Sequence, residues 1–169
     1  MKREWKMSKI TVRCAIFIIG LSLLIFSSCQ FQKSDSEIAN DWEKTIISCI
    51  NNHDTENLKE SFSCFIVQSH NIDNESDKLF KCFRSKIVES TDALGGVRES
   101  WRNGKCVLRT VTSSFNVTLE NGREYTIIVG GYVNSEDDSK LGIKVVDVRW
   151  ASNNALICRV GEWDLGDVD

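Results

Sequence analysis

The pattern of apolar and polar residues divides this chain of 169 residues into three parts. An uncharged, mostly apolar run covers residues 14–28. Residues 36–83 then place apolar side chains every three or four positions, which is the period of an amphipathic helix. From residue 86 onward, apolar and polar residues alternate, which is typical of β-strands. The order predicts a leader, then helices, then a sheet.

The helical part predicts three helices. The first covers about residues 36–51, with a capping box of Ser34 and Glu37 at its start. A second helix follows Asp54, and a short third helix begins near residues 71–73. The side chains expected to face inward are Ile38, Trp42, Ile46, Cys49 and Ile50, then Leu58, Phe62 and Phe65, then Leu79, Phe80 and Phe83.

Two long strands, at residues 106–119 and 123–133, dominate the second half. Most odd positions of the first strand are apolar and its even positions from residue 110 onward are polar, so one face is expected to be buried. Shorter strands are expected at residues 86–91, 97–101, 141–150 and 155–163. The apolar side of residues 141–150 switches from odd to even positions, so this strand either contains a β-bulge or is covered on both faces.

The turn between the two long strands decides their register. A two-residue Asn-Gly loop would pair apolar residues with polar ones. A three-residue loop with Gly122 in the left-handed conformation instead pairs Val117 with Tyr125 and Phe115 with Ile127. We therefore predict the three-residue loop, and we expect the glycine pair 130–131 to bend the second strand.

The leader has the features of an export signal. Five Lys or Arg residues and one Glu precede the apolar run, whose 15 residues are too few to span a bilayer. Residues 24–28, LIFSS, followed by Cys29, resemble the lipobox of bacterial lipoproteins, with Phe26 where Leu is usual. The resemblance implies cleavage between Ser28 and Cys29 and attachment of acyl chains such as palmitate at Cys29. Plain secretion after Ser28 and a short uncleaved anchor are the alternatives.

The lipobox sets the expected domains and location. Residues 1–28 would be a lipoprotein signal peptide, residues 29–36 a lipidated tether, and residues 37–169 a single α+β domain. The lipid on Cys29 would hold that domain on the extracytoplasmic side of the bacterial cell membrane.

The net charge of the chain narrows its possible partners. Without the leader, the chain keeps 16 Lys and Arg against 23 Asp and Glu, a net charge of −7, which disfavours nucleic acid as a partner.

Five cysteines follow Cys29, namely Cys49, Cys64, Cys82, Cys106 and Cys158. Because their number is odd, at least one thiol has no intramolecular partner, and the sequence leaves their pairing open. Burial as small apolar residues is the simplest expectation for most of them.

Residues 37–150 resemble the nuclear-transport-factor-2-like superfamily. The stretch 50–63, INNHDTENLKESFS, carries most of the resemblance, as two helices joined by a short turn that contains Asp54. The resemblance implies N-terminal helices packed in a strongly curved, mostly antiparallel sheet, a cone with an apolar cavity. Together with the lipobox, the layout is similar to an uncharacterised bacterial lipoprotein family, domain of unknown function 5104, which implies no activity. Aromatic residues at these spacings are more often plain core than cavity lining, and the candidates for lining the cavity are Trp42, Trp101, Tyr125 and Tyr132.

No pattern predicts catalysis or metal binding. His53 stands beside Asp54, but no nucleophile motif accompanies the pair, so we expect a turn residue. The acidic loop 134–138 lacks the glycine and the terminal glutamate of an EF-hand. We expect no catalytic residue, no metal and no cofactor.

These observations favour a membrane-anchored, non-catalytic module that binds a small molecule or a protein. One alternative is a small cavity enzyme that transfers a proton through an acid or a histidine. Another is an anchored immunity or inhibitor protein whose acidic surface binds a basic partner.

Overall fold

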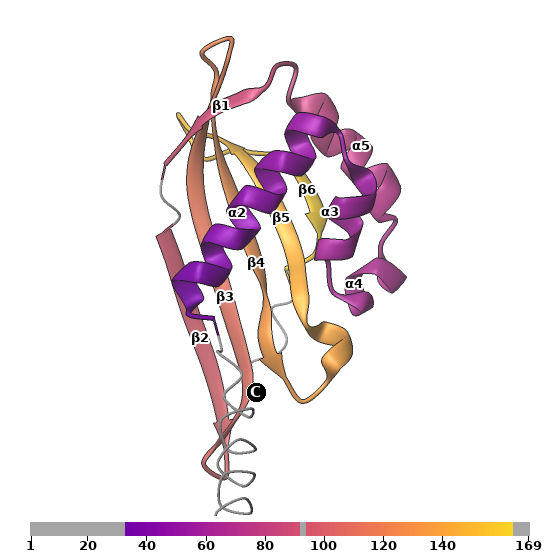
Figure 1. The fold of residues 1–169 in the computed structure, drawn as a ribbon, viewed down its shortest axis with the longest axis vertical. Helices are drawn as coiled ribbons and strands as arrows, with labels where there is room; N and C mark the ends of the chain where they lie inside the picture. The colour runs from indigo at the N-terminus through magenta and orange to yellow at the C-terminus, as the bar shows by residue number, and fades with distance from the viewer. Residues whose placement is uncertain (1–32, 92–93, 164–169) are drawn as a thin grey trace, which may run out of the picture. The chain divides into compact units, whose positions relative to one another are not determined.

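The structure, a computed structural model, describes residues 33–91 and 94–163, in which helices come first and strands follow (Figure 1). The α+β class expected from the sequence is confirmed. Its elements belong to one compact unit that starts at Ser34. They are α2 (Asp35–Asn52), α3 (Thr55–Ser61), α4 (Cys64–Ser69), α5 (Ile72–Cys82), β1 (Ile87–Ser90), β2 (Leu94–Arg102), β3 (Lys105–Leu119), β4 (Glu124–Ser135), the 3₁₀ turn η1 (Asp138–Lys140), β5 (Gly142–Trp150) and β6 (Leu156–Gly161).

Helix α2 begins and ends where its capping residues predict. The backbone N–H of Ser34 donates to the Glu37 carboxylate at 2.7 Å, and the N–H of Glu37 donates back to the Ser34 hydroxyl at 3.3 Å. His53 ends the helix in the left-handed conformation, with φ 53°. Asp54 then caps α3 by accepting from the N–H of Asn57 at 3.0 Å.

Helix α3 ends at Ser61 and a new helix follows, so the expected inward position of Phe65 is wrong. Phe65 was predicted to face inward with Leu58 and Phe62, yet 47% of it is exposed. The cause is a new helix, α4, whose cap is Ser63: the hydroxyl of Ser63 accepts from the N–H of Ile66 at 3.4 Å. Because α4 begins a new helix, Phe65 does not share the buried face to which Leu58 and Phe62 belong.

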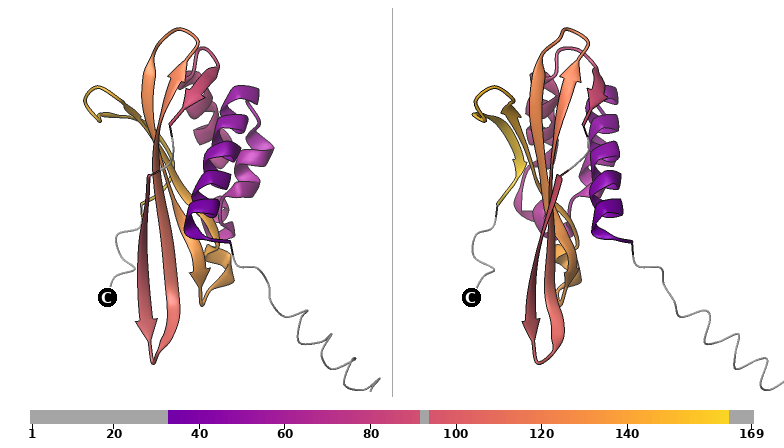
Figure 2. Two further views of the ribbon diagram at one scale, coloured as in Figure 1. Left: turned by 60° about the vertical axis from the view of Figure 1, so that its left-hand side comes forward. Right: turned by 90° about the vertical axis from the view of Figure 1, so that its left-hand side faces the viewer.

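All six strands form one curled antiparallel sheet in the order β1-β3-β4-β5-β6, and β2 pairs with a separate stretch of β3. The predicted register between β3 and β4 is confirmed. Val117 lies opposite Tyr125 and Phe115 opposite Ile127, and Gly122 has a φ of 76°. The helices pack against one face of the sheet, and the apolar core fills the space between them (Figure 2).

Strand β5 is covered on both faces and also contains a β-bulge, so both predicted explanations of its change of apolar side are confirmed. Every residue from Ile143 to Val148 is buried, so both faces are covered. In addition, Gly130 pairs with Val145 and Gly131 with Ile143, which leaves Lys144 as the extra residue of a bulge.

The glycine pair of β4 lets two tryptophans approach the backbone closely. A Cβ at Gly131 would collide with the carbonyl of Gly142 and lie 2.9 Å from the Trp42 ring. A Cβ at Gly130 would lie 2.8 Å from the Trp163 ring. These approaches place the bulge that carries Lys144.

None of the helices described is both long and apolar enough to cross a membrane.

Candidate functional site

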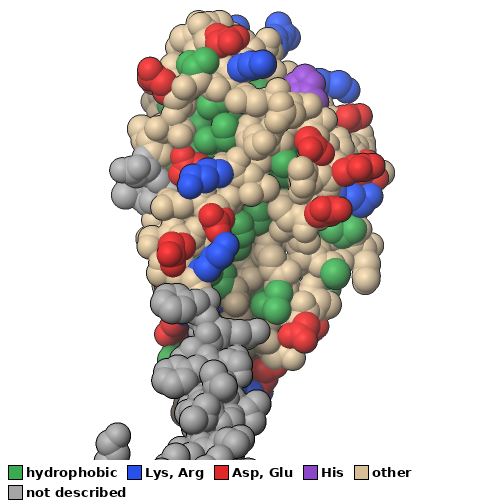
Figure 3. Space-filling view, in the orientation of Figure 1, with side chains coloured by type: hydrophobic (Ala, Val, Ile, Leu, Met, Phe, Trp, Pro, Cys, Tyr) green, Lys and Arg blue, Asp and Glu red, His purple; other side chains and the backbone are tan. Residues whose placement is uncertain are grey.

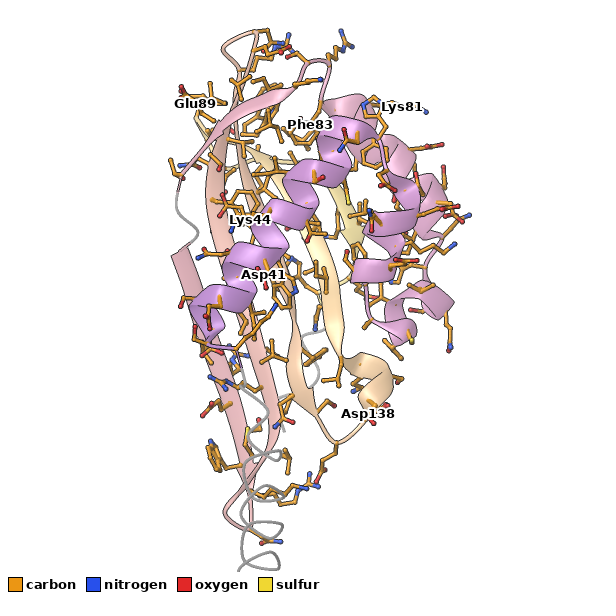
Figure 4. The ribbon with its side chains drawn as sticks, in the orientation of Figure 1. Asp41, Lys44, Lys81, Phe83, Glu89 and Asp138 are labelled. Carbon is orange, nitrogen blue, oxygen red and sulfur yellow. The ribbon has the colours of Figure 1, made fainter. Side chains whose placement is uncertain are left out.

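A small cavity of about 90 Å³ lies beside α4, where β4 and β5 join through η1 (Figure 4, in which Asp138 marks η1). A second hollow of about 480 Å³ opens widely to solvent along α2, where polar residues line most of it. A buried charged residue lines each of them, Glu43 in the hollow and Lys144 in the smaller cavity, and we take the smaller cavity with its lysine charge as the candidate site because it is the more enclosed. Its lining residues are Ser63, Phe65, Ile66, Tyr132, Lys140, Lys144 and Glu162.

Lys144 supplies that charge. The residue is 6% exposed, although both of its neighbours in β5 are fully buried apolar residues. Its ammonium group donates to the phenol oxygen of Tyr132 at 3.1 Å and lies 4.8 Å from the centre of that ring. Lys140 places a second ammonium group 6.0 Å from the same ring. Two ammonium groups therefore lie near the Tyr132 ring at the cavity.

The start of α4 forms another part of the cavity wall. Phe62 pairs with Ile143 as a short parallel bridge, and the N–H of Ser63 donates to the Ile143 carbonyl at 2.8 Å. Gly142 permits this approach, because its φ of 121° and its contact with the backbone of Ser63 leave no space for a side chain. The segment extends the edge of β5 beyond the end of β6.

Glu162 forms an acidic rim. Its carboxylate lies 3.3 Å from Nε2 of His70, whose Nδ1 lies 3.2 Å from Glu75. The other oxygen of Glu75 accepts from the N–H of Gly161 at 2.8 Å. This chain of contacts fixes the end of β6 against the start of α5. The backbone N–H of Glu162 donates to the Lys144 carbonyl at 3.0 Å, so a carboxylate lines the same cavity as the two lysines.

A separate charged cluster surrounds Asp147, which is fully buried. Its carboxylate accepts from Arg159 at 2.6 and 2.9 Å, from Arg149 at 3.0 Å and from the Trp163 indole at 3.1 Å. Burial by itself would raise the pKa of Asp147, but the hydrogen bonds from Arg159, Trp163 and Arg149 outweigh it and hold that pKa below 3.8. The cluster fastens the end of the described chain to the sheet, so we assign it to stability.

The structure places the four predicted aromatic residues in different surroundings. Tyr132 lines the cavity. Tyr125 is buried between Phe83 and Trp150, with ring centres 5.3 and 5.1 Å away. Trp42 is half-buried against Gly131. Trp101 is 62% exposed, and its indole donates to Glu99 at 3.2 Å.

Other sequence candidates have structural roles or lie elsewhere. His53 is the C-cap of α2 and stacks on Phe80 at 5.3 Å. In the acidic loop, Asp137 caps η1. Within residues 33–91 and 94–163, no group of three His, Cys, Asp or Glu side chains could hold a metal ion. The predicted cleavage and lipidation positions, Ser28 and Cys29, lie outside the described residues.

Sequence reasoning did not find Lys140, Lys144 or Glu162. A signal for Lys144 was present: Lys144 and Asp147 interrupt the otherwise apolar run 143–148 of a strand expected to be covered on both faces. A charge in such a strand is buried only with compensating contacts, so the pattern indicates a candidate site.

Comparison with known proteins gives a family. No curated protein matches the chain significantly. A family model described as "Domain of unknown function (DUF5104)" matches residues 45–153, well over half of the chain. The matched range includes Tyr132, Lys140 and Lys144, whereas Glu162 lies beyond it. The chain therefore belongs to the DUF5104 family.

Proposed function

We propose that this protein is a lipid-anchored binding module on the extracytoplasmic side of the bacterial membrane, and that it binds a carboxylate group in the Lys144 cavity. The anchor rests on the basic start, the apolar run 14–28 and Cys29, which together match a lipoprotein signal. A curled sheet with helices on one face supports a cone of the nuclear-transport-factor-2 type.

The buried ammonium of Lys144 carries the binding proposal. Removing an ammonium group from water is unfavourable by several kcal/mol, and apolar residues of similar volume usually replace buried charges without loss of stability. A lysine at this position of β5 is therefore expected to serve a purpose other than packing. Its place in a cavity wall, with Lys140 nearby, favours recognition of a negative group.

The cavity limits the size and charge of that group. A volume of about 90 Å³ is below that of an engineered protein cavity of about 150 Å³ that holds benzene, so it admits only a few heavy atoms. Phe65 and Ile66 give it apolar walls. Glu162 at the rim repels dianions more strongly than monoanions. These features favour a short-chain carboxylate, or a carboxylate side chain of a protein partner.

The alternative functions have less support. A proton-transfer enzyme needs a cavity carboxyl with a raised pKa. The described carboxyls with clearly changed pKa values are Asp137 and Asp147, and both are lowered, Asp137 by hydrogen bonds from the hydroxyl and the N–H of Ser139. An inhibitor that acts through an acidic surface needs a patch of one sign, but acidic and basic side chains intermingle on the face in Figure 3.

The test is a titration of the full chain, purified from membranes in mild detergent, with acetate, propionate and butyrate. We expect saturable binding that Lys144→Met weakens at least tenfold. Lys44→Met is the matched control, because Lys44 is exposed on α2 (Figure 4) and should leave binding unchanged. Circular dichroism would check that both variants fold. Absence of saturation with all three carboxylates, or equal binding by Lys144→Met, would contradict the proposal.

A further inference from the structure

Two thiols meet where helix α5 packs on strand β6. Cys82 is the last residue of α5, between Lys81 and Phe83, which Figure 4 labels. Cys158 lies in β6, opposite Val148 of β5. Both side chains are half-buried against the core. The Cys82 thiol donates to the Lys78 carbonyl at 3.3 Å, and the thiols of Cys82 and Cys158 lie close enough to change each other's pKa.

The packing of α5 along β6 independently places these residues together. At the start of the helix, the Glu75 carboxylate accepts from the N–H of Gly161. Seven residues further along a helix correspond to about 10 Å, at about 1.5 Å per residue. Three residues back along a strand also correspond to about 10 Å, at about 3.3 Å per residue. Helix α5 and strand β6 run in opposite directions (Figure 1), so this matched spacing brings Cys82 to the level of Cys158.

The other described cysteines lie in different surroundings. Cys49 is buried in α2, and burial, assisted by the charge of Asp54, raises the pKa of its thiol to about 11. Cys64 is exposed on α4. Cys106 donates from its sulfur to the Leu108 carbonyl at 3.4 Å.

The contact also makes the two thiols unequal. The hydrogen bond from Cys158 lowers the pKa of Cys82 to about 7 against the opposing effect of burial. The same hydrogen bond, together with burial, raises the pKa of Cys158. A thiolate is the attacking species in disulfide exchange, so Cys82 is the group prepared to react first.

We propose that Cys82 and Cys158 form a reversible disulfide that fastens α5 to the edge strand β6. The oxidant is a second disulfide, R–S–S–R, of the kind found outside the cytoplasm, so the inference rests on the proposed location. The Cys82 thiolate attacks one sulfur, and one RS⁻ leaves and takes up a proton. The Cys158 thiol then loses its proton and attacks the Cys82 sulfur, which releases the second RSH. Two protein thiols become one disulfide, and R–S–S–R is reduced to two RSH.

The bond would act on the candidate site through the helix it holds. Glu75 of α5 contacts both His70 and the end of β6, and His70 contacts Glu162 at the cavity rim. A covalent link at the other end of α5 would keep this rim in place. Oxidation would therefore rigidify the wall that carries Glu162.

The experiment uses the full chain in detergent, equilibrated with mixtures of reduced and oxidised glutathione. Free thiols are alkylated and the protein is digested for mass spectrometry. We expect a peptide pair linked through Cys82 and Cys158 in oxidising mixtures, lighter by two hydrogens than the separate peptides. Dithiothreitol should abolish it. The disulfide linkage is assigned in the protein without substitutions, so the result does not depend on the folding of a variant.

Variants and kinetics sharpen the outcome. Cys64→Ser and Cys106→Ser should keep the linked pair, whereas Cys82→Ser and Cys158→Ser should lose it. Alkylation of Cys82 in the reduced protein should follow a pKa near 7, well below the ordinary thiol value of 9.0. The proposal is overturned if both thiols stay fully alkylatable after equilibration with oxidised glutathione, or if either one links to another cysteine instead. Failure of carboxylate binding would leave this result unaffected, so the two proposals are tested separately.

Discussion

The ammonium group of Lys144 lies 3.1 Å from the phenol oxygen of Tyr132 and 4.8 Å from the centre of its ring. The same residue thus provides both a hydrogen-bond acceptor and a π-face to a buried cation. The two side chains come from neighbouring strands, and a β-bulge brings them together. Their pairing is the structural basis of the candidate site.

Tyr132→Phe separates the two contributions. The substitution keeps the ring and the cavity wall but removes the oxygen that accepts from Lys144. We expect a loss of about 1.5 kcal/mol in the free energy of unfolding, which is the low end of the range for one hydrogen bond to a charged group. Carboxylate affinity should fall less than threefold, because the cation remains. Urea denaturation and the butyrate titration measure the two effects, and a loss of affinity as large as that of Lys144→Met would assign binding to the phenol instead.

Gly131→Ala tests the close approach on which the bulge depends. The added Cβ would meet the carbonyl of Gly142, the Cα of Ile143 and the Trp42 ring. Two of these are backbone atoms that cannot rotate away, so we expect a loss of about 3 kcal/mol.

Gly96→Ala is the matched control for this substitution. Gly96 also lies in a strand, but a Cβ there would meet nothing within 4 Å. Its stability should change by less than about 0.5 kcal/mol, or rise slightly because alanine restricts the unfolded chain. Equal effects of the two alanines in thermal unfolding would show that Gly131 is not held between β5 and Trp42 as described.

Asp147→Asn tests the buried cluster through its pH dependence. The pKa of Asp147 in the folded state lies below 3.8, so the unfolded chain binds the proton first as the pH falls. The stabilisation by this carboxylate is therefore complete above about pH 5 and is lost progressively as the pH falls from the unfolded pKa through the lower folded pKa. We expect the variant to lose about 3 kcal/mol at pH 7, because Arg159 and Arg149 lose their charged partner. The difference from the unmodified chain should shrink at pH 3, and a constant difference from pH 7 to pH 3 would refute the assignment.

Asn51→Ala tests the link between α2 and the first strand. The Asn51 amide donates to the carbonyl of Ile87 at 3.1 Å and accepts from its N–H at 2.8 Å. Removing both hydrogen bonds leaves two part-buried backbone groups without these partners, which should reduce stability by about 2 kcal/mol.

The neighbouring asparagine provides the comparison. Asn52 is exposed, and its amide donates to the Ser48 hydroxyl at 3.3 Å within the same helix. Asn52→Ala should change the free energy of unfolding by less than about 0.5 kcal/mol. Because alanine has the higher helix propensity, a similar loss in both variants would mean that the contact with β1 does not explain the result.

Local signals in the sequence predicted much of this fold. The capping residues Ser34 and Asp54 predict where α2 and α3 begin, because a cap depends on residues within one turn. The β3–β4 register follows from Gly122 and the alternation on each side of it, because one wrong step would expose the whole apolar face.

Features that depend on distant segments were not predicted. The break between α3 and α4 depends on the pairing of Phe62 and Ser63 with Ile143, which lies about eighty residues further along the chain. The cavity depends on the bulge at Lys144 and on the backbone approach at Gly142. Neither the loop around Phe62 nor the strand around Lys144 carries a local pattern that specifies its partner.

Intact-mass measurement of the chain purified from bacterial membranes tests the central proposal most directly. We predict a mature protein that begins at Cys29, lacks residues 1–28 and carries the added mass of a diacylglycerol group with or without a further acyl chain. In Cys29→Ala, this added mass should be absent and the protein should leave the membrane fraction. An unmodified Cys29 in the membrane-bound protein, or a retained leader, would contradict the account.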